Sequence, residues 1–278
     1  MDNVSDIRAY YDASVCGENA RLQRHQIEHD ITLRYLGEYL PPKSRVLEIG
    51  AATGAYTLWL ARRGHHVTAV DFSGKLIEEC KRQVADKKLG RRVDCYVADA
   101  RDLSPVPSQS FDAVLLMGPL YHLVLKADRK KALREAFNRL RPGGFLFSIL
   151  ISRYGIMGHL LRCISHWIEN QGEVRSVIER GQDPEDHPKG GFRGYFASVE
   201  EIAPLHETSG FKTIVLAGVE PAISGDDEIY NRLEGKRRKL WLDLLYELSR
   251  EASLVASSQH LLYIGQKPKK RGASRTNL

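Results

Sequence analysis

The sequence predicts an α/β protein whose mostly parallel sheet is covered by helices on both faces. From residue 45 onward, short apolar runs of strand length alternate with segments in which apolar residues recur at helical spacing. Glycine and proline pairs such as Pro41-Pro42 and Gly143-Gly144 separate these segments. Strands that alternate with helices of this length indicate βαβ units, whose right-handed crossovers make neighbouring strands parallel.

The expected elements follow one another in a simple order. The short apolar runs that predict buried strands cover residues 45–50, 67–71, 92–97, 111–117, 145–151, 211–219 and 260–265. Single long helices are expected over residues 18–40 and 227–253, and shorter ones begin after the N-cap residue Ser73 and end before Gly143. Residues 152–209 interrupt the alternation with two or three helices and a loop rich in glycine and proline, which we interpret as an inserted lid.

These elements predict five consecutive units along the chain. They are an N-terminal helical cap (1–40), a ligand-binding core (41–151), a helical lid that sets substrate choice (152–209), the C-terminal part of the core (210–266) and a disordered basic tail (267–278).

Composition and charge exclude several classes of protein. Hydrophobic residues make up 42% of the 278 residues and charged residues 27%, which excludes a largely disordered or fibrous chain. Of the net charge of +6, the tail carries five basic residues and no acid, so 6 − 5 leaves +1 for residues 1–266. A nearly neutral body disfavours nucleic-acid binding. No run is long enough to cross a bilayer, and the acidic N-terminus is unlike a signal peptide. We therefore expect a cytoplasmic protein without nucleic-acid or membrane partners.

Cysteine and histidine spacing predicts reduced thiols and no metal site. Cys16, Cys80, Cys95 and Cys163 contain no Cys-x-x-Cys pair. A helix could place His25 and His29 on one face, but the sequence shows no third ligand for them.

The stretch VLEIGAATGAYT, residues 46–57, is the most informative in the chain. A buried strand runs directly into Gly50 and Gly54 and then into a helix. Small residues at such a turn let the backbone approach a ligand closely, and the start of the next helix offers free amides to a polar group.

Aspartates follow the next two predicted strands. Asp71 ends the second strand, 21 positions after Gly50, where a carboxylate can accept both hydroxyls of a ribose. Asp99 follows the third strand at the same edge of the sheet. Either aspartate alone would be interpreted as a helix cap or turn residue. Because the glycine-rich turn, Asp71 and Asp99 each follow one of three successive strands, the pattern as a whole favours a ligand site.

Residues 45–151 resemble the class I S-adenosylmethionine-dependent methyltransferases that act on small molecules. The turn Glu48-Ile-Gly50-Ala-Ala52-Thr-Gly54 matches the family pattern Glu-x-Gly-x-Gly-x-Gly, except that Ala52 replaces the middle glycine. The added methyl group is expected to reduce cofactor affinity without closing the site. The resemblance implies a Rossmann-like, doubly wound, seven-stranded sheet with its last strand antiparallel, and S-adenosylmethionine as the cofactor.

The resemblance also implies which residues surround the cofactor. The expected cofactor-binding residues are Tyr11 and Arg24 over its carboxylate, Glu48, Gly50, Ala51 and Gly54 along its methionine part, Asp71 and Phe72 at the ribose and adenine, Asp99 and Ala100 at the adenine amino group, and Met117 and Gly118 beneath the methyl sulfonium.

Rival families fit the sequence less well. A dinucleotide dehydrogenase would carry Gly-x-Gly-x-x-Gly, a spacing that is absent. By family resemblance, a nucleic-acid base methyltransferase would carry Asn/Asp-Pro-Pro-aromatic after the fourth strand, where this chain has Met117-Gly118-Pro119-Leu120. A non-catalytic module that binds S-adenosylmethionine remains an alternative.

Methyl transfer requires the protein mainly to align the acceptor and exclude water. His122 is the candidate base for a hydroxyl substrate, with a hydrogen-bonded wall residue as the alternative. The residues expected to bind substrate are Tyr121, His122, Arg153, His159, Arg193 and Tyr195. Because the arginines suit an anionic or phenolic molecule, we expect O-methylation of a carboxylate or hydroxyl. N- or C-methylation and a homodimer are left open.

Overall fold

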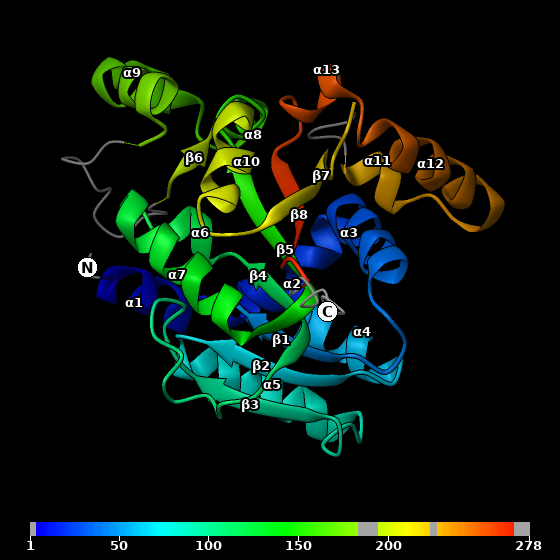
Figure 1. The fold of residues 1–278 in the computed structure, drawn as a ribbon. Helices are drawn as coiled ribbons and strands as arrows, with labels where there is room; N and C mark the ends of the chain where they lie inside the picture. Colours follow the sequence, from blue (N-terminus) through cyan, green and yellow to red (C-terminus); the bar gives the residue numbers. More distant parts are fainter. Residues whose placement is uncertain (1–3, 183–193, 223–226, 270–278) are drawn as a thin grey trace, which may run out of the picture.

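The computed structural model describes residues 4–182, 194–222 and 227–269. In these parts the chain forms one sheet with helices on both faces (Figure 1). Arg193 and most of the predicted basic tail lie outside the described residues.

The sheet confirms the predicted fold class and holds one strand more than predicted. In the described part it has eight strands: β1 (Arg45–Ile49), β2 (His66–Asp71), β3 (Val93–Val97), β4 (Phe111–Met117), β5 (Leu140–Ser152), β6 (Phe196–Ala197), β7 (Lys212–Gly218) and β8 (His260–Gln266). The order is β3-β2-β1-β4-β5-β8-β7, with β6 paired to β5. The strands from β3 to β5 along this order pair in parallel, and β8 is antiparallel to both of its neighbours. The extra strand β6 is only two residues long, which is too short to leave an apolar pattern.

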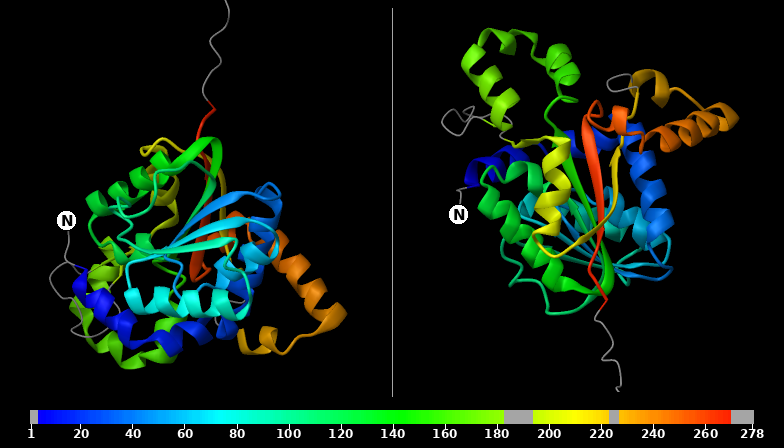
Figure 2. Two further views of the ribbon diagram at one scale, coloured as in Figure 1. Left: turned by 90° about the horizontal axis from the view of Figure 1, so that it is seen from below. Right: turned by 45° about the horizontal axis from the view of Figure 1, so that its top comes forward.

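Two apolar layers cover the sheet. One face packs against α3 (Gln26–Tyr39), α4 (Ala55–Arg62), the Cys80 side of α5 (Gly74–Asp86) and α12 (Gly235–Leu248). The other face packs against α6 (Pro119–His122), α7 (Lys126–Arg139), α10 (Val199–Glu207) and α13 (Ala252–Val255). The view from below in Figure 2 shows the helices on both sides of the strands.

The two long helices expected from the sequence are both interrupted. Residues 18–40 divide into α2 (Val15–Arg24) and α3, because His25 leaves the helical conformation with φ −111° and ψ 62°. Residues 227–253 divide into α11 (Asp227–Asn231), α12 and α13. Gly235, at φ +51°, begins α12. A periodicity of apolar residues persists across such breaks, so the sequence pattern alone does not reveal them.

The chain before α2 forms a further short helix, α1 (Ser5–Ala13). Asp12 accepts a hydrogen bond from Ser73 Oγ at the start of α5. Asn19 on α2 forms hydrogen bonds with Glu79 and Gln83, which both lie on α5. These contacts attach the N-terminal helices to the edge of the sheet that carries the ends of β1 and β2. Ser73 also caps α5, as predicted, by accepting from Leu76 N at 3.2 Å.

Helices α8 (Met157–Cys163), η1 (Ser165–Glu169) and α9 (Gln171–Arg180) extend from the end of β5 at the top of the molecule (Figures 1 and 2). Neither α8 nor η1 contains a buried residue. The segment therefore stands off the two apolar layers. No helix within the described ranges is both long and apolar enough to span a bilayer.

Candidate functional site

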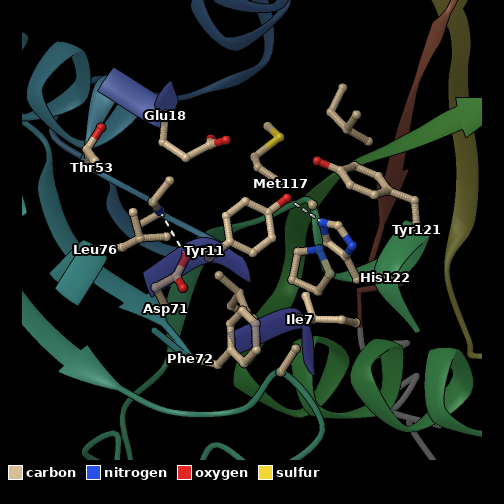
Figure 3. A pocket seen from close by; sticks show the side chains of 18 of the residues that line it. Ile7, Tyr11, Glu18, Thr53, Asp71, Phe72, Leu76, Met117, Tyr121 and His122 are labelled. Atoms are coloured by element: carbon tan, nitrogen blue, oxygen red, sulfur yellow. Dashed lines mark hydrogen bonds between the residues drawn. The ribbon is translucent and has the colours of Figure 1, made fainter. Parts of the chain in front are cut away.

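A pocket opens at the carboxyl ends of β1, β2 and β4, where the sequence predicts the ligand. Its empty volume is about 1080 Å³, a figure that includes the part open to solvent. The predicted site residues that line it are Tyr11, Gly50, Ala51, Asp71, Phe72, Asp99, Ala100, Met117, Gly118, Tyr121 and His122. Figure 3 shows several of these side chains around the same space.

The glycine-rich loop follows β1 and brings bare backbone to the pocket wall. Gly50 has φ +83°, and a Cβ built on it would lie 2.3 Å from the carbonyl oxygen of Met117. Only glycine fits this approach of two backbone segments. Ala52, where the family pattern has glycine, also adopts a positive φ of 48°. The loop therefore keeps the glycine conformation despite the methyl group, and it leaves a cradle that fits the methionine part of the predicted cofactor.

Asp71 is buried and faces the pocket, and its carboxylate also holds the loop. One oxygen accepts from Ala52 N and the other from Ser73 N, each at 3.0 Å. Burial raises the pKa of Asp71 to about 6, against the opposing effect of backbone hydrogen bonds from Ser73, Ala52 and Phe72. Each carboxylate oxygen has a second acceptor position, so the group fits the two hydroxyls of a ribose.

Asp99 lies on the pocket wall with a partner that sequence reasoning missed. Its carboxylate accepts from Arg101 Nη2 at 2.7 Å, and Arg101 Nη1 reaches Asp128 at 2.7 Å. The arginine is buried between the two acids. Asp99 is thus fixed in orientation by Arg101, which the sequence pattern did not single out.

Tyr11 projects into the pocket from α1 (Figure 3). Its hydroxyl lies 2.7 Å from His122 Nε2. Burial raises the pKa of Tyr11 well above its usual value, so the phenol stays protonated and can donate to the imidazole. His122 and Tyr121 lie on α6, directly after Met117 and Gly118. The predicted base is therefore already hydrogen-bonded to another residue of the pocket.

A linked set of charged side chains forms part of the pocket wall and continues behind it. Arg21 donates to both oxygens of Glu28, at 3.0 and 3.1 Å, and both residues line the pocket. Behind them His260 Nδ1 lies 3.7 Å from Glu28 and 2.7 Å from Glu220. Sequence reasoning missed this group of charged residues because its members are far apart in the sequence. Arg21 lies on α2 and Glu28 on α3, whereas Glu220 and His260 come from distant C-terminal segments.

Each of these four charged side chains has a neighbour of opposite charge. Burial opposes the charge on Glu28, but Arg21 and His260 outweigh it and lower the pKa of Glu28. Burial likewise opposes the charge on His260, but Glu28 and Glu220 raise its pKa above 6.5. Glu28, Glu220 and His260 place possible metal-ligand atoms within 4.8 Å of one another. These atoms are engaged with Arg21 and with each other.

Three predicted cofactor residues lie outside the pocket wall. Arg24 is exposed and bonds to the carbonyl of Gly17 at 3.4 Å, whereas Arg21, one helical turn earlier, lines the pocket. Glu48 lies beneath the loop and accepts from Thr57 Oγ1 at 2.5 Å. Burial raises the pKa of Glu48 to about 8. Gly54 packs against Cys80.

Three of the residues expected from the lid, Arg153, His159 and Tyr195, do not line this pocket. Arg153 is buried and donates to the carbonyls of Phe196 and Glu179 and to the Glu201 carboxylate. The Tyr195 hydroxyl also donates to Glu201, at 2.6 Å. His159 lies on α8, outside the pocket wall. Arg153 and Tyr195 thus bond to other residues of the predicted lid, and the expected role of these residues as substrate ligands stays a prediction.

Comparison with known proteins identifies the central part of the chain. Residues 47–148 match the family described as "Methyltransferase domain". These residues form a class I methyltransferase domain. The family prediction is confirmed, and S-adenosylmethionine is the cofactor of this family, as predicted.

Individual relatives match this chain over part of its length. A ubiquinone/menaquinone biosynthesis C-methyltransferase of Geotalea daltonii is 31% identical over 124 residues, 43% of this chain and 51% of its own length. A ubiquinone biosynthesis O-methyltransferase of Xanthomonas axonopodis pv. citri is 32% identical over 124 residues, 44% and 50% of the two chains. The chain thus spans about half the length of these curated relatives.

A solved structure shows the same fold over more of the chain. The Burkholderia thailandensis 1,6-didemethyltoxoflavin-N1-methyltransferase, solved with its substrate and S-adenosylhomocysteine, has a TM-score of 0.60 at 18% identity. The alignment covers 95% of this chain and 88% of that one. This likeness supports the fold class, including the elements outside residues 47–148.

Proposed function

We propose that this protein binds S-adenosylmethionine in the pocket at the ends of β1, β2 and β4 and transfers its methyl group to a small molecule. The observation that carries the proposal is the convergence of the Gly50 loop, Asp71, Asp99 and Met117-Gly118 on one pocket. When bound, the cofactor supplies an activated methyl group on a sulfonium. The family match covers residues 47–148 and so only part of the chain. The relatives named above support methyl transfer as the reaction class.

The chain's own residues would hold and orient the cofactor. Asp71 would accept the ribose hydroxyls, and the backbone beside Gly50 would receive the methionine part. Arg21, rather than Arg24, is the guanidinium that borders the pocket, so it is the better candidate for the cofactor's carboxylate. Its two hydrogen bonds to Glu28 fix the plane of the guanidinium and leave other N–H groups available.

We propose a hydroxyl group on a neutral ring, such as a phenol or hydroquinone, as the methyl acceptor. Arg153 and Tyr195 bond to other parts of the chain, so the structure offers no support from them for a carboxylate substrate. Tyr11 and His122 can accept the hydroxyl proton as a pair, because Tyr11 can pass a proton to His122 Nε2 at 2.7 Å. Methylation at a ring carbon or nitrogen is the alternative outcome. Cytoplasmic location and a homodimer stay predictions.

Cofactor binding is tested first by calorimetry with S-adenosylmethionine on wild type, Asp71→Asn and Asp94→Asn. Asp94 is exposed on β3 and outside the pocket, so its variant is the matched control. We expect Asp71→Asn to bind at least about ten-fold more weakly and the control to bind as wild type. Affinity should also fall below about pH 6, where Asp71 protonates. Undetectable binding to wild type would reject the proposal.

The reaction is tested next with isotope-labelled cofactor and a panel of phenols, hydroquinones, carboxylic acids and amines. We expect label on the oxygen of a ring hydroxyl. Label on carbon or nitrogen would correct the acceptor atom but keep the reaction class. Tight cofactor binding with no transfer to any acceptor would favour the non-catalytic module.

A further inference from the structure

Two cysteines lie side by side directly behind the cofactor loop. Cys80 on α5 and Cys95 on β3 place their sulfur atoms 4.0 Å apart. Cys80 is fully buried and Cys95 half-buried. Both thiols are free, and they come from segments fifteen positions apart that pack against each other.

Cys80 also supports two parts of the pocket. A Cβ built on Gly54 would lie 2.7 Å from Cys80 Sγ, so this sulfur fills the space behind the end of the glycine-rich loop. Leu76, one turn earlier on α5, lines the pocket itself. A movement of the Cys80 side chain is therefore transmitted to the loop or to the helix that borders the cofactor site.

The surroundings of the pair differ in a way that favours Cys95 as the reactive thiol. Cys95 lies on the edge strand of the sheet and is the more accessible of the two. The hydrogen bond from Cys80 lowers the pKa of Cys95, with a further contribution from Lys81, although burial opposes it. The thiolate is the nucleophilic form of cysteine, and it is favoured at partly exposed, electropositive positions.

We propose that Cys80 and Cys95 are a modification site, at which a peroxide oxidant forms an intramolecular disulfide that weakens the cofactor pocket. The Cys95 thiolate attacks one peroxide oxygen, so an S–O bond forms, the O–O bond breaks and hydroxide leaves. Cys80 then attacks the sulfur of this sulfenic acid, and the S–O oxygen leaves as water once protonated. In total, two thiols are oxidised by two electrons and hydrogen peroxide is reduced to two water molecules.

Bond formation requires a local rearrangement. The sulfur atoms must approach each other by about 2 Å. This movement withdraws Cys80 Sγ from its packing behind Gly54 or draws α5 toward β3. Either change alters a wall of the pocket, so we expect the oxidised form to bind the cofactor about ten-fold more weakly. By linkage, bound cofactor should shift the dithiol–disulfide equilibrium toward the reduced form by the same factor.

The effect on affinity rests on the proposed function, whereas formation of the bond does not. The full chain is treated with hydrogen peroxide, free thiols are blocked, and peptides are mapped by mass spectrometry. We expect a Cys80–Cys95 linkage that is lighter than the two thiols by two hydrogen atoms and is reversed by dithiothreitol. Calorimetry with S-adenosylmethionine then compares the reduced, oxidised and re-reduced protein.

Matched variants separate this pair from the exposed thiols. Cys16→Ser combined with Cys163→Ser removes the two exposed cysteines and should leave the linkage and its effect unchanged. Cys95→Ser should abolish both, and Cys95→Ala provides a second variant if the serine protein is unstable. Oxidation confined to Cys16 and Cys163 would overturn the proposal, as would a Cys80–Cys95 bond that leaves affinity unchanged. If reduced wild type fails to bind the cofactor, the proposed function fails while the linkage is still measured.

Discussion

At the scale of single residues, the pocket depends on backbone conformations that few side chains tolerate. Gly50 meets a carbonyl oxygen where any Cβ would collide, whereas Ala52 accepts a left-handed conformation at an energetic cost. Asp71 combines two roles, because the carboxylate that faces the pocket also bonds to two backbone amides. A small change at either Gly50 or Asp71 therefore affects both loop geometry and ligand binding.

The first prediction concerns Gly50→Ala. The new methyl group would lie 2.3 Å from Met117 O and 2.8 Å from Pro119 Cδ, in addition to the strain of a positive φ. We expect a loss of about 2–4 kcal/mol in the free energy of unfolding and loss of detectable cofactor binding. Urea denaturation and calorimetry measure the two effects.

Gly64→Ala is the matched control for that change. Gly64 has φ +89° but nothing within 4 Å of a built Cβ. It should cost only about 1 kcal/mol, from backbone strain alone, and leave cofactor affinity unchanged. Equal losses in the two variants would show that strain, not the close approach to Met117, decides the effect.

At the scale of elements, buried polar contacts join the segments of the predicted lid to one another. Arg153 follows β5 and bonds to the end of α9, to β6 and to Glu201 on α10. These bonds link α9 to β6 and α10, both of which also contribute residues to one apolar layer of the sheet. The arginine therefore orders the lid, and its effect on a substrate would be indirect.

The second prediction follows for Arg153→Ala. Removal of the guanidinium deprives two backbone carbonyls and the Glu201 carboxylate of a hydrogen-bond donor. The free energy of unfolding should therefore fall by about 2–4 kcal/mol. Affinity for S-adenosylmethionine should stay within two-fold. Arg162→Ala, on the exposed face of α8, should change stability by less than about 0.5 kcal/mol. Unchanged stability with a raised KM for the acceptor would instead support the substrate-binding role expected from the sequence.

At the scale of the whole molecule, ion pairs connect His25 and helix α3 to residues in the C-terminal part of the sequence. Glu28 near the N-terminus is paired with Arg21 and His260, and Glu220 completes the chain of charges. Nearby, Asp30 accepts from Arg238 and Tyr230, and His25 pairs with Asp227. The N-terminal helices are thus held by C-terminal residues through many polar contacts.

The third prediction is a pH dependence of stability that originates from His260. The folded pKa of His260 is raised above 6.5, so its protonated form stabilises the fold. This contribution is complete below about pH 6.5 and is lost as the pH rises through the folded pKa. The free energy of unfolding, measured with urea from pH 6 to pH 9, should fall over this interval.

His260→Asn tests the origin of that slope. It should be about 3 kcal/mol less stable at pH 6, because Glu220 and Glu28 lose a buried cation, and its slope should be shallower. A residual slope is expected from Glu48, whose pKa of about 8 lies above the usual 4.5, so that its ionisation also destabilises the fold as the pH rises from 4.5 to 8. Identical slopes in wild type and variant would assign the dependence to other groups.

Local patterns predicted much of this structure, and long-range contacts account for what they missed. The strand positions, the glycine-rich loop and the pocket positions of Asp71, Asp99 and Met117 follow from motifs that each occupy a few consecutive residues. Arg21, Glu28 and His260 could not be found in this way, because their chemistry arises from contact between distant segments. Composition does not reveal which way a side chain points, so it could not show that Arg24 is exposed or that Arg153 bonds to Glu201.

The pairing of Glu28 with His260 has a consequence for biosynthesis. As the chain leaves the ribosome, Glu28 is made 232 residues before its imidazole neighbour His260. The charges at this wall of the pocket can therefore reach their final balance only after His260 has been synthesised. Until then, Arg21 is the partner from this group that can neutralise Glu28.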